Sequence, residues 1–343
     1  RMFEEVIMKR WIVTQLGDPS DALQLVDIDL GELRLGEVKV KVEAAAMNFF
    51  DILQCQGKYQ EKYELPFTPG AEVAGVIEEV TEGSKYKVGE HVIVTSRPPE
   101  GGFSQYVHVP EEKVFPIPKE LPFEEAAGFY ITHHTGYYGL KYRGQLKEGE
   151  ILLVHAGAGG VGSAAIQIGK ALGATVIATA GSDEKVAICK AHGADYAINY
   201  NTEDFVQVVK EITKNRGADV IYDSVGGDVF QKSRKCIAFD GRILTIGYAS
   251  GEMPTTPINH ILVKNYSIVG VHFGLFAHLY PEQVNEAHEE LMRLYVAGKL
   301  KPLVYKTYAM DELPKALDEL GSRRTYGKLI LKPWVSSAVI DAV

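Results

Sequence analysis

The chain has 343 residues, and its content of 46% hydrophobic and 24% charged residues is typical of globular proteins rather than of collagen-like, low-complexity or disordered chains. Its 36 basic and 45 acidic residues give a net charge of −9. A net acidic chain without a basic block is poorly suited to binding nucleic acid, and no apolar stretch approaches the roughly 18 residues that span a bilayer. We therefore expect neither nucleic acid nor a membrane as a partner.

The cysteines indicate a reducing compartment. Cys55, Cys189 and Cys236 are odd in number and far apart, so they form neither a disulfide framework nor a CxxC pair. The first residues lack the basic and apolar regions of a secretory signal, and we expect a cytoplasmic location. Because the chain begins with Arg1, an earlier targeting segment, and with it a mitochondrial location, stays an alternative.

The first third of the chain is predicted to be β-rich. Val38, Val40 and Val42 alternate with polar residues, a two-residue period that gives a strand one apolar face. Further strands are expected at residues 72–80, 91–95 and 103–109, separated by Gly and Pro. This spacing indicates a small twisted barrel or sandwich.

After Pro122 the pattern changes to alternating strands and helices, which predicts βαβ units and a parallel sheet. Helices are expected at residues 124–142, 160–173, 183–193, 229–239 and 281–298, and strands at 151–155, 175–180, 218–225, 242–247, 268–273, near 304 and at 328–331. We expect an α/β protein with a β-rich domain at residues 1–130 and 275–343. A doubly wound parallel-sheet domain is expected at residues 131–274.

A glycine-rich turn follows the first strand of the expected parallel sheet. Gly157-Ala158-Gly159-Gly160-Val161-Gly162 has the GxGxxG spacing and opens an apolar helix. The first glycine permits the tight turn, the second allows backbone to approach a pyrophosphate, and the third lets helix and strand pack closely. The turn therefore predicts binding of a dinucleotide.

The end of the second strand favours NADPH as the cofactor. An NAD site places a carboxylate there to accept from the ribose 2′-OH. This chain has Gly181 and Ser182 instead, and Lys185 adds positive charge one helical turn later. The alternative is that Asp183 takes the carboxylate role and Lys185 is a solvated helix residue. Tyr200 is a further candidate for the adenosine phosphate or, equally, a packing residue.

With this fingerprint after a β-rich domain, the chain resembles the medium-chain dehydrogenase/reductase superfamily, and within it the zinc-free quinone oxidoreductase branch, especially the quinone oxidoreductase-like protein 2 group. The similarity covers about residues 9–333. The motifs that carry it are Asn48-Phe-Phe-Asp51, Gly57-Lys-Tyr59, residues 65–75, residues 101–106, Thr135-Gly-Tyr137, the glycine turn, residues 181–185, residues 225–230 and residues 241–247. The resemblance implies a GroES-like catalytic domain, formed by both ends of the chain, and an inserted Rossmann domain of six strands.

The resemblance also implies that the chain lacks a catalytic zinc. Where the zinc-dependent relatives have their first Cys this chain has Asn48, and where they have Gly-His-Glu it has Ala71 in place of the His. A replacement site built from Cys55, His133 and His134 is disfavoured because adjacent residues on a helix point about 100° apart. We expect no metal.

Without a metal, a quinone or an activated enone is the expected acceptor, because both are electron-poor enough to take a hydride directly. The protein must then orient the acceptor and donate hydrogen bonds to the oxygen where charge develops. The resemblance implies that Asn48 and Tyr59 face the cleft near the nicotinamide, so their amide and hydroxyl groups are the candidate donors. Asp51 is a candidate to orient Asn48 or the nicotinamide. The alternatives are a loop cap for Asn48, a solvent-facing ring for Tyr59 and a helix-capping role for Asp51.

Further cofactor contacts are expected by resemblance or from positions at the carboxyl ends of strands. They are Thr135, Gly247, Tyr248, Val271, Phe273 and Arg323. The activity expected is NADPH-dependent reduction of quinones, with reduction of enones or enals as one alternative and an NADPH-binding structural or sensing protein as another. We also expect a homodimer, because the apolar edge strand at residues 267–273 would pair with its copy across a two-fold axis.

Overall fold

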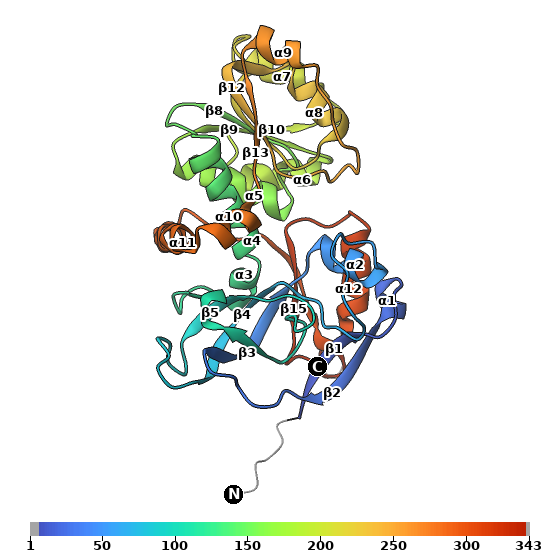
Figure 1. Cartoon of the computed structure of the whole chain (residues 1–343). Helices are drawn as coiled ribbons and strands as arrows, with labels where there is room; N and C mark the ends of the chain where they lie inside the picture. The colour runs from blue at the N-terminus through green and yellow to red at the C-terminus, as the bar shows by residue number, and fades with distance from the viewer. Residues whose placement is uncertain (1–6, 341–343) are drawn as a thin grey trace, which may run out of the picture. The chain divides into compact units, whose positions relative to one another are not determined.

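The computed structural model describes residues 7–340, so the features expected at residues 1–6 lie outside the described part. The chain forms two compact units: the chain up to Tyr130 joins the chain from Val304 onward, and Ile131–Leu303 forms the second unit (Figure 1). The return to the first unit at Val304 corrects the expected boundary at residue 275. The reason is that Phe273 and His288, on the two helices after the last strand of the second unit, stack on His134 of that same unit.

The first unit is built on a large sheet with β3 in its interior. The order is β14-β15-β3-β4-β5-β7, with β6 also paired to β3, while β1 and β2 form a separate antiparallel pair. Val38, Val40 and Val42 of β3 are fully buried, which confirms the alternation read from the sequence. The strands are β1 (Ile7–Val13), β2 (Leu23–Asp29), β3 (Glu37–Ala46), β4 (Glu72–Val80), β5 (His91–Thr95), β6 (Tyr106–Pro110), β7 (Val114–Pro116), β14 (Val304–Ala309) and β15 (Lys328–Lys332).

Short helices accompany this sheet, and the helix at residues 313–321 is among those that were not expected. The short helices are α1 (Pro19–Ala22), α2 (Phe49–Gln56), α3 (Phe123–Ala127), α12 (Leu313–Gly321), α13 (Ser337–Ile340) and the 3-10 turns η1 (Glu111–Lys113) and η3 (Met310–Glu312). Sequence reasoning missed α12, although Leu313, Ala316 and Leu317 have helical spacing and are fully buried. The helix packs against α2 and so supports the segment that carries the candidate site.

The second unit has a six-stranded parallel sheet in the order β10-β9-β8-β11-β12-β13. The order reverses beside β8, which confirms the doubly wound fold and places the ligand-binding edge at the carboxyl ends of the strands. The strands are β8 (Ile151–Val154), β9 (Thr175–Ala180), β10 (Tyr196–Asn199), β11 (Ala218–Asp223), β12 (Ile237–Thr245) and β13 (Ser267–Gly270).

Two of the expected helices of this unit differ in extent, and the helices at residues 205–212, 258–264 and 273–279 were not expected. The helices of the unit are α4 (Tyr130–Tyr137), the π-helical turn η2 (Tyr138–Arg143), α5 (Gly160–Ala171), α6 (Asp183–Ala191), α7 (Phe205–Ile212), α8 (Gly227–Ser233), α9 (Ile258–Lys264), α10 (Phe273–Leu279) and α11 (Pro281–Val296). The single helix expected at residues 124–142 is interrupted at Gly128. The helix expected at residues 229–239 ends at Ser233, because Ile237 already pairs with Ala218 of β11.

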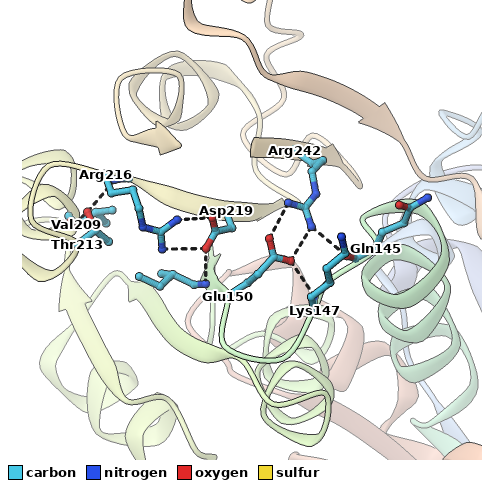
Figure 2. A network of polar contacts seen from close by, with 10 residues as sticks. Gln145, Lys147, Glu150, Val209, Thr213, Arg216, Asp219 and Arg242 are labelled. Carbon is cyan, nitrogen blue, oxygen red and sulfur yellow. Dashed lines mark hydrogen bonds and ion pairs between the residues drawn. The ribbon is translucent and has the colours of Figure 1, made fainter. Parts of the chain in front are cut away.

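A network of ion pairs fixes the amino ends of the central strands (Figure 2). The Arg242 guanidinium on β12 donates to both carboxylate oxygens of Glu150, at 2.9 and 2.8 Å. Asp219 accepts from Arg216 and from the backbone N–H of Ile151, which starts β8. Burial is the largest single effect and raises the pKa of Glu150, but the hydrogen bonds from Arg242 and from the Lys147 N–H, together with the charge of Arg242, hold the pKa below its usual value. The network therefore ties β8 to β11 and β12 at the edge opposite the expected ligand.

Cys55, Cys189 and Cys236 are free and buried, in agreement with the expected lack of disulfides. Within residues 7–340, no helix combines the length and apolar character needed to cross a bilayer.

Candidate active site and dinucleotide site

Three side chains of the first unit form a buried polar cluster before α2. Asn48 precedes the helix, Glu72 starts β4 and Lys328 starts β15. Asn48 Nδ2 donates to Glu72 Oε2 at 3.0 Å, and Lys328 Nζ donates to Asn48 Oδ1 at 2.6 Å and to Glu72 Oε2 at 3.2 Å. The Glu72 side chain is fully buried and that of Lys328 is 11% exposed. An amide thus bridges a cation and a carboxylate in the interior of the unit.

Sequence reasoning missed Lys328, the cation of this cluster. Its side chain passes Gly128, where an added Cβ would lie only 2.8 Å from Lys328 Cγ. The available signal was Glu72, because a carboxylate in an apolar strand requires a cation if it is buried. That signal does not say which of 36 basic residues supplies the charge, since Lys328 lies 256 residues away in the sequence.

The side chains in this region do not fit a catalytic zinc. At the positions of two expected ligands stand the Asn48 amide and the Ala71 methyl group, and the Glu72 carboxylate is bound to the Lys328 ammonium. Burial raises the pKa of the Cys55 thiol to about 12, which keeps it protonated. No group of three His, Cys, Asp or Glu side chains suited to a metal occurs within residues 7–340.

Asp51 has one satisfied and one unsatisfied carboxylate oxygen. Oδ2 accepts the backbone N–H of Asn48 at 2.7 Å, so the capping alternative holds for this oxygen. Oδ1 is buried and has no hydrogen-bond partner. Burial raises the pKa of the Asp51 carboxyl to about 7, against smaller effects of the Asn48 N–H and of Lys328, which lower it.

Asp51 and Tyr59 line the same cavity, which has a volume of about 180 Å³. The lining residues are Phe50, Asp51, Gln54, Tyr59, Glu61, Tyr63, Gly70, Ala71, Arg97 and Pro98. The Tyr59 ring lies 5.9 Å from that of Phe50, and burial, followed by the charges of Glu61 and Asp51, raises the Tyr59 pKa. Asn48 is not among the lining residues. The cavity therefore joins Tyr59 with Asp51, whereas the sequence pairs Tyr59 with Asn48.

In the second unit, the glycine turn lies between β8 and α5, where the sequence predicts it. An added Cβ on Gly162 would lie 2.1 Å from the carbonyl oxygen of Ala156, and one on Gly157 would lie 2.8 Å from Cys189 Sγ. At Gly159 the only neighbour within 4 Å is the same Ala156 oxygen, at 3.4 Å. Gly159 precedes α5 and supplies no side-chain cap, so the first N–H groups of this helix can bind a pyrophosphate.

His155, another residue that sequence reasoning missed, holds this turn in place. Its Nδ1 lies 2.9 Å from Thr179 Oγ1 on β9, and its Nε2 lies 2.8 Å from Ser233 Oγ on α8. Burial lowers its pKa to about 4, so the ring is neutral and each nitrogen has a hydroxyl partner. The residue that follows β8 is thus connected to two neighbouring elements.

At the end of β9 the structure brings the expected adenosine-site residues together. Ser182 caps α6 by accepting the backbone N–H of Lys185, at 3.2 Å. A Cβ on Gly181 would lie 2.9 Å from the Tyr200 hydroxyl, so that ring covers Gly181. Asp183, the alternative ribose ligand, accepts from Asn199 Nδ2 at 2.9 Å.

The remaining expected cofactor contacts lie in both units. Thr135 is half-buried on α4, Gly247 and Tyr248 follow β12, and Val271 follows β13. Phe273 is buried at the start of α10 and stacks on His134 at 5.5 Å. Arg323 belongs to the first unit, where its guanidinium lies 5.6 Å from the Phe49 ring.

Comparison with known families assigns a domain to each unit. Residues 34–119 match the alcohol dehydrogenase GroES-like domain, and residues 160–292 match the zinc-binding dehydrogenase family. These matches agree with the β-rich and doubly wound parts of the fold.

Individual proteins resemble the chain along most of its length. A quinone oxidoreductase-like protein 2 homolog from Nematostella vectensis is 38% identical over 304 residues, covering 87% of this chain and 82% of that protein. A 2-haloacrylate reductase from Burkholderia sp. is 33% identical over 328 residues, covering 94% and 98%. The solved structure of Escherichia coli quinone oxidoreductase complexed with NADPH has a TM-score of 0.85 and 31% identity, covering 95% of this chain and 100% of that one.

Alanine substitutions at Gly162 and Gly159 should have different effects, one on stability and the other on dinucleotide binding. Gly162→Ala places a methyl group against backbone and should lower the stability of the cofactor-free protein by about 1–3 kcal/mol. Gly159→Ala should leave that stability almost unchanged but weaken dinucleotide binding by roughly tenfold or more, about 1.4 kcal/mol. Thermal melting without cofactor and calorimetric titration with NADPH and NADH measure the two effects. Gly17→Ala, whose Cβ would meet only an ordinary 3.7 Å contact, is the control. Wild-type binding by Gly159→Ala would show that this backbone does not approach the pyrophosphate.

Proposed function

The chain belongs to the medium-chain dehydrogenase/reductase superfamily and within it to the quinone oxidoreductase family, and on that basis we propose that it is an NADPH-dependent reductase that transfers hydride to quinones without a metal. The observation that carries the proposal is the Lys328–Glu72–Asn48 cluster. Because the Lys328 ammonium is bound to Glu72 and Asn48, we infer that this cluster holds no Lewis acid and that the acceptor must already be electron-poor. Quinones meet that condition.

Reduction of an enone or enal is the second candidate. Its support is the similarity to a 2-haloacrylate reductase, which is named for a substrate with an activated C=C bond. In such a substrate the hydride adds to the β-carbon, and the resulting enolate takes a proton. A quinone likewise takes one hydride and one proton, so both acceptors make the same demands on the site.

The choice of NADPH rests on the end of β9. The position of a ribose-binding carboxylate is occupied by Gly181, and the Ser182 hydroxyl remains able to donate to a phosphate oxygen while it accepts from Lys185 N. The half-buried Lys185 adds a cation near this position. Bound NADPH would supply the hydride, with its pyrophosphate on the glycine turn and its 2′-phosphate beside Ser182, Lys185 and Tyr200.

The oxidation of NADPH with a panel of acceptors tests the proposal. The panel contains 9,10-phenanthrenequinone, 1,4-benzoquinone and a linear enone, each assayed before and after exhaustive chelation. We expect turnover of the quinones at the same rate after chelation. Binding of NADPH without oxidation by any acceptor would instead favour a structural or sensing role. Stoichiometric zinc whose removal abolishes activity would overturn the metal-free mechanism.

Lys185→Ala should weaken the binding of NADPH selectively. A hydrogen bond to a charged group contributes about 1.5–3 kcal/mol, so we expect a loss of roughly tenfold or more for NADPH and little change for NADH. Titration calorimetry with both cofactors measures the ratio. The exposed Lys190 lies at the other end of α6, and Lys190→Ala is the matched control. Equal affinity of the wild-type protein for both cofactors would contradict the assignment.

Tyr59→Phe should lower kcat/KM without abolishing the binding of NADPH. Loss of one hydrogen bond to a developing oxyanion costs up to about 10²–10³-fold in acyl transfer. We expect about tenfold with a quinone and a larger loss with an enone, whose enolate is the stronger base. Asn48→Ala should also lower kcat/KM, but it removes the amide between Glu72 and Lys328, so its melting temperature must be measured as well. Tyr305→Phe, in a ring pair with Tyr326, is the control, and a wild-type rate for Tyr59→Phe would remove Tyr59 from the mechanism.

We further propose a homodimer formed along β13. This strand is an edge of the six-stranded sheet, and the preceding helix α9 exposes Ile258, Leu262 and Val263 by about 80% each. Leu262→Glu should shift the protein from a dimer towards the 37.8 kDa monomer in light scattering at micromolar concentration. Leu35→Glu, at an exposed position of the first unit, should leave the dimer intact. A monomeric wild-type protein would contradict the proposal.

A further inference from the structure

Two residues that line the cavity beside α2 each have a buried side-chain oxygen without a hydrogen-bond partner among the described residues. These oxygens are Asp51 Oδ1 and Gln54 Oε1. Buried acceptors normally have a partner, which is either a protein group, a water molecule or a proton on one of the oxygens. A polar cavity of about 180 Å³ has room for water, whose share of liquid volume is about 30 Å³ per molecule.

Burial of Asp51 favours retention of a proton on its carboxyl group. The strongest effect is burial, which raises the pKa to about 7, and the neighbouring Glu72 carboxylate acts in the same direction. Lys328 on β15 and the backbone N–H groups of Asn48 and Gly70 lower the pKa, but by less than burial raises it.

Other ionisable groups near Asp51 are Cys55 on α2 and four residues of the cavity wall. Cys55, on the next turn of α2, has a raised pKa of about 12 and remains a thiol. The cavity wall adds the phenols of Tyr59 and Tyr63, the carboxylate of Glu61 and the guanidinium of Arg97. Asp51 is therefore the buried group of the cavity that changes its charge in the physiological range.

Tyr59 requires such a proton source. If Tyr59 donates its hydroxyl proton to the reduced acceptor, it becomes a tyrosinate beside Glu61 and Asp51. Burial and the charge of Glu61 raise the Tyr59 pKa, as does Asp51 when it is ionised, so the tyrosinate is disfavoured and must be protonated again.

We propose that Asp51 is the proton reservoir of the reduction and that it reloads Tyr59 through water in the shared cavity. This inference rests on the proposed function. NADPH gives a hydride, with both electrons, to the acceptor and becomes NADP⁺. The Tyr59 O–H bond breaks as the proton joins the acceptor, and the Asp51 O–H bond breaks as its proton passes to the Tyr59 oxygen. The Asp51 carboxylate then takes a proton from solvent, which makes the sum one hydride and one proton per acceptor.

Asp51→Asn tests the proposal, because an amide keeps the size of the side chain and can still accept the Asn48 N–H but cannot deliver a proton as an acid. The wild-type rate with an enone should be highest below pH 7 and fall as the pH rises through about 7, since the acid form is the active one. In Asp51→Asn we expect kcat at pH 6.5 to fall by about tenfold or more, at the lower end of general-acid effects. We also expect the decline near pH 7 to disappear.

Asp204→Asn is the matched control, because the Asp204 carboxylate also caps a helix, α7, but in the second unit. It should keep both the rate and the pH profile. Tyr59→Phe, at a half-buried position, interrupts the relay without touching the cap and should also abolish the decline near pH 7. It keeps the test decisive if Asp51→Asn does not fold.

The outcomes separate this inference from the proposed function. A wild-type protein that oxidises NADPH with none of the acceptors refutes the proposed function. A wild-type protein that is active with a flat profile between pH 6 and 8.5 refutes the role of Asp51. A slower Asp51→Asn variant that retains the decline near pH 7 also refutes it and leaves Asp51 with a structural role only.

Discussion

The ion pair between Glu72 and Lys328 is the constraint on which the rest of the candidate active site depends. A fully buried carboxylate is costly without a cation, and this one receives the ammonium at 3.2 Å. The same ammonium donates to Asn48 Oδ1, so the orientation of the amide follows from the ion pair. Neutralisation of Glu72 also limits its repulsion of the Asp51 carboxyl, whose pKa is then governed mainly by burial.

The second unit is organised by a different constraint, the steric limits of backbone packing at the glycine turn. Contacts at Gly157 and Gly162 leave no room for a Cβ, while Gly159 has a single neighbour at 3.4 Å. The turn is therefore closed towards the protein and open at the residue that faces the expected pyrophosphate. His155 holds the turn at the carboxyl ends of the strands, and the ion pairs of Arg242 and Asp219 fix the opposite edge. The strands are therefore held at both their amino and carboxyl ends. This suits a site that binds a ligand through backbone N–H groups, because the positions of these groups are set by the backbone.

Local patterns predicted the features that depend on local sequence. The alternation of valines in β3, the parallel strands and the spacing of the glycines each reflect the geometry of one element, and the structure confirms all three. The helix expected at residues 229–239 failed for the opposite reason, because pairing of Ile237 with β11 overrides the local preference. The boundary expected at residue 275 failed because contacts with α4 hold the two following helices in the second unit.

The polar contacts of the candidate site were less predictable because their partners are distant in sequence. Lys328 lies 280 residues from Asn48, and His155 lies 78 residues from Ser233. The sequence suggested Asn48, Asp51 and Tyr59 but could not show that Asp51 has an unsatisfied oxygen and lines the same cavity as Tyr59. Which of two nearby polar residues faces a cavity depends on packing in three dimensions.

The charge balance of the first unit limits the kind of reduction it can support. Lys328 is already bound to Glu72, so this cation is not free to neutralise a strongly basic oxyanion. Under the proposed function, the negative charge that develops on an acceptor is therefore removed by a proton rather than held by a cation. Such a site suits acceptors whose reduced forms are stable once protonated, as hydroquinones and saturated carbonyl compounds are. It is poorly suited to alcohol oxidation, in which an alkoxide must be stabilised before hydride leaves. The buried Asp51 carboxyl, with a pKa of about 7, is a proton source that fits this requirement.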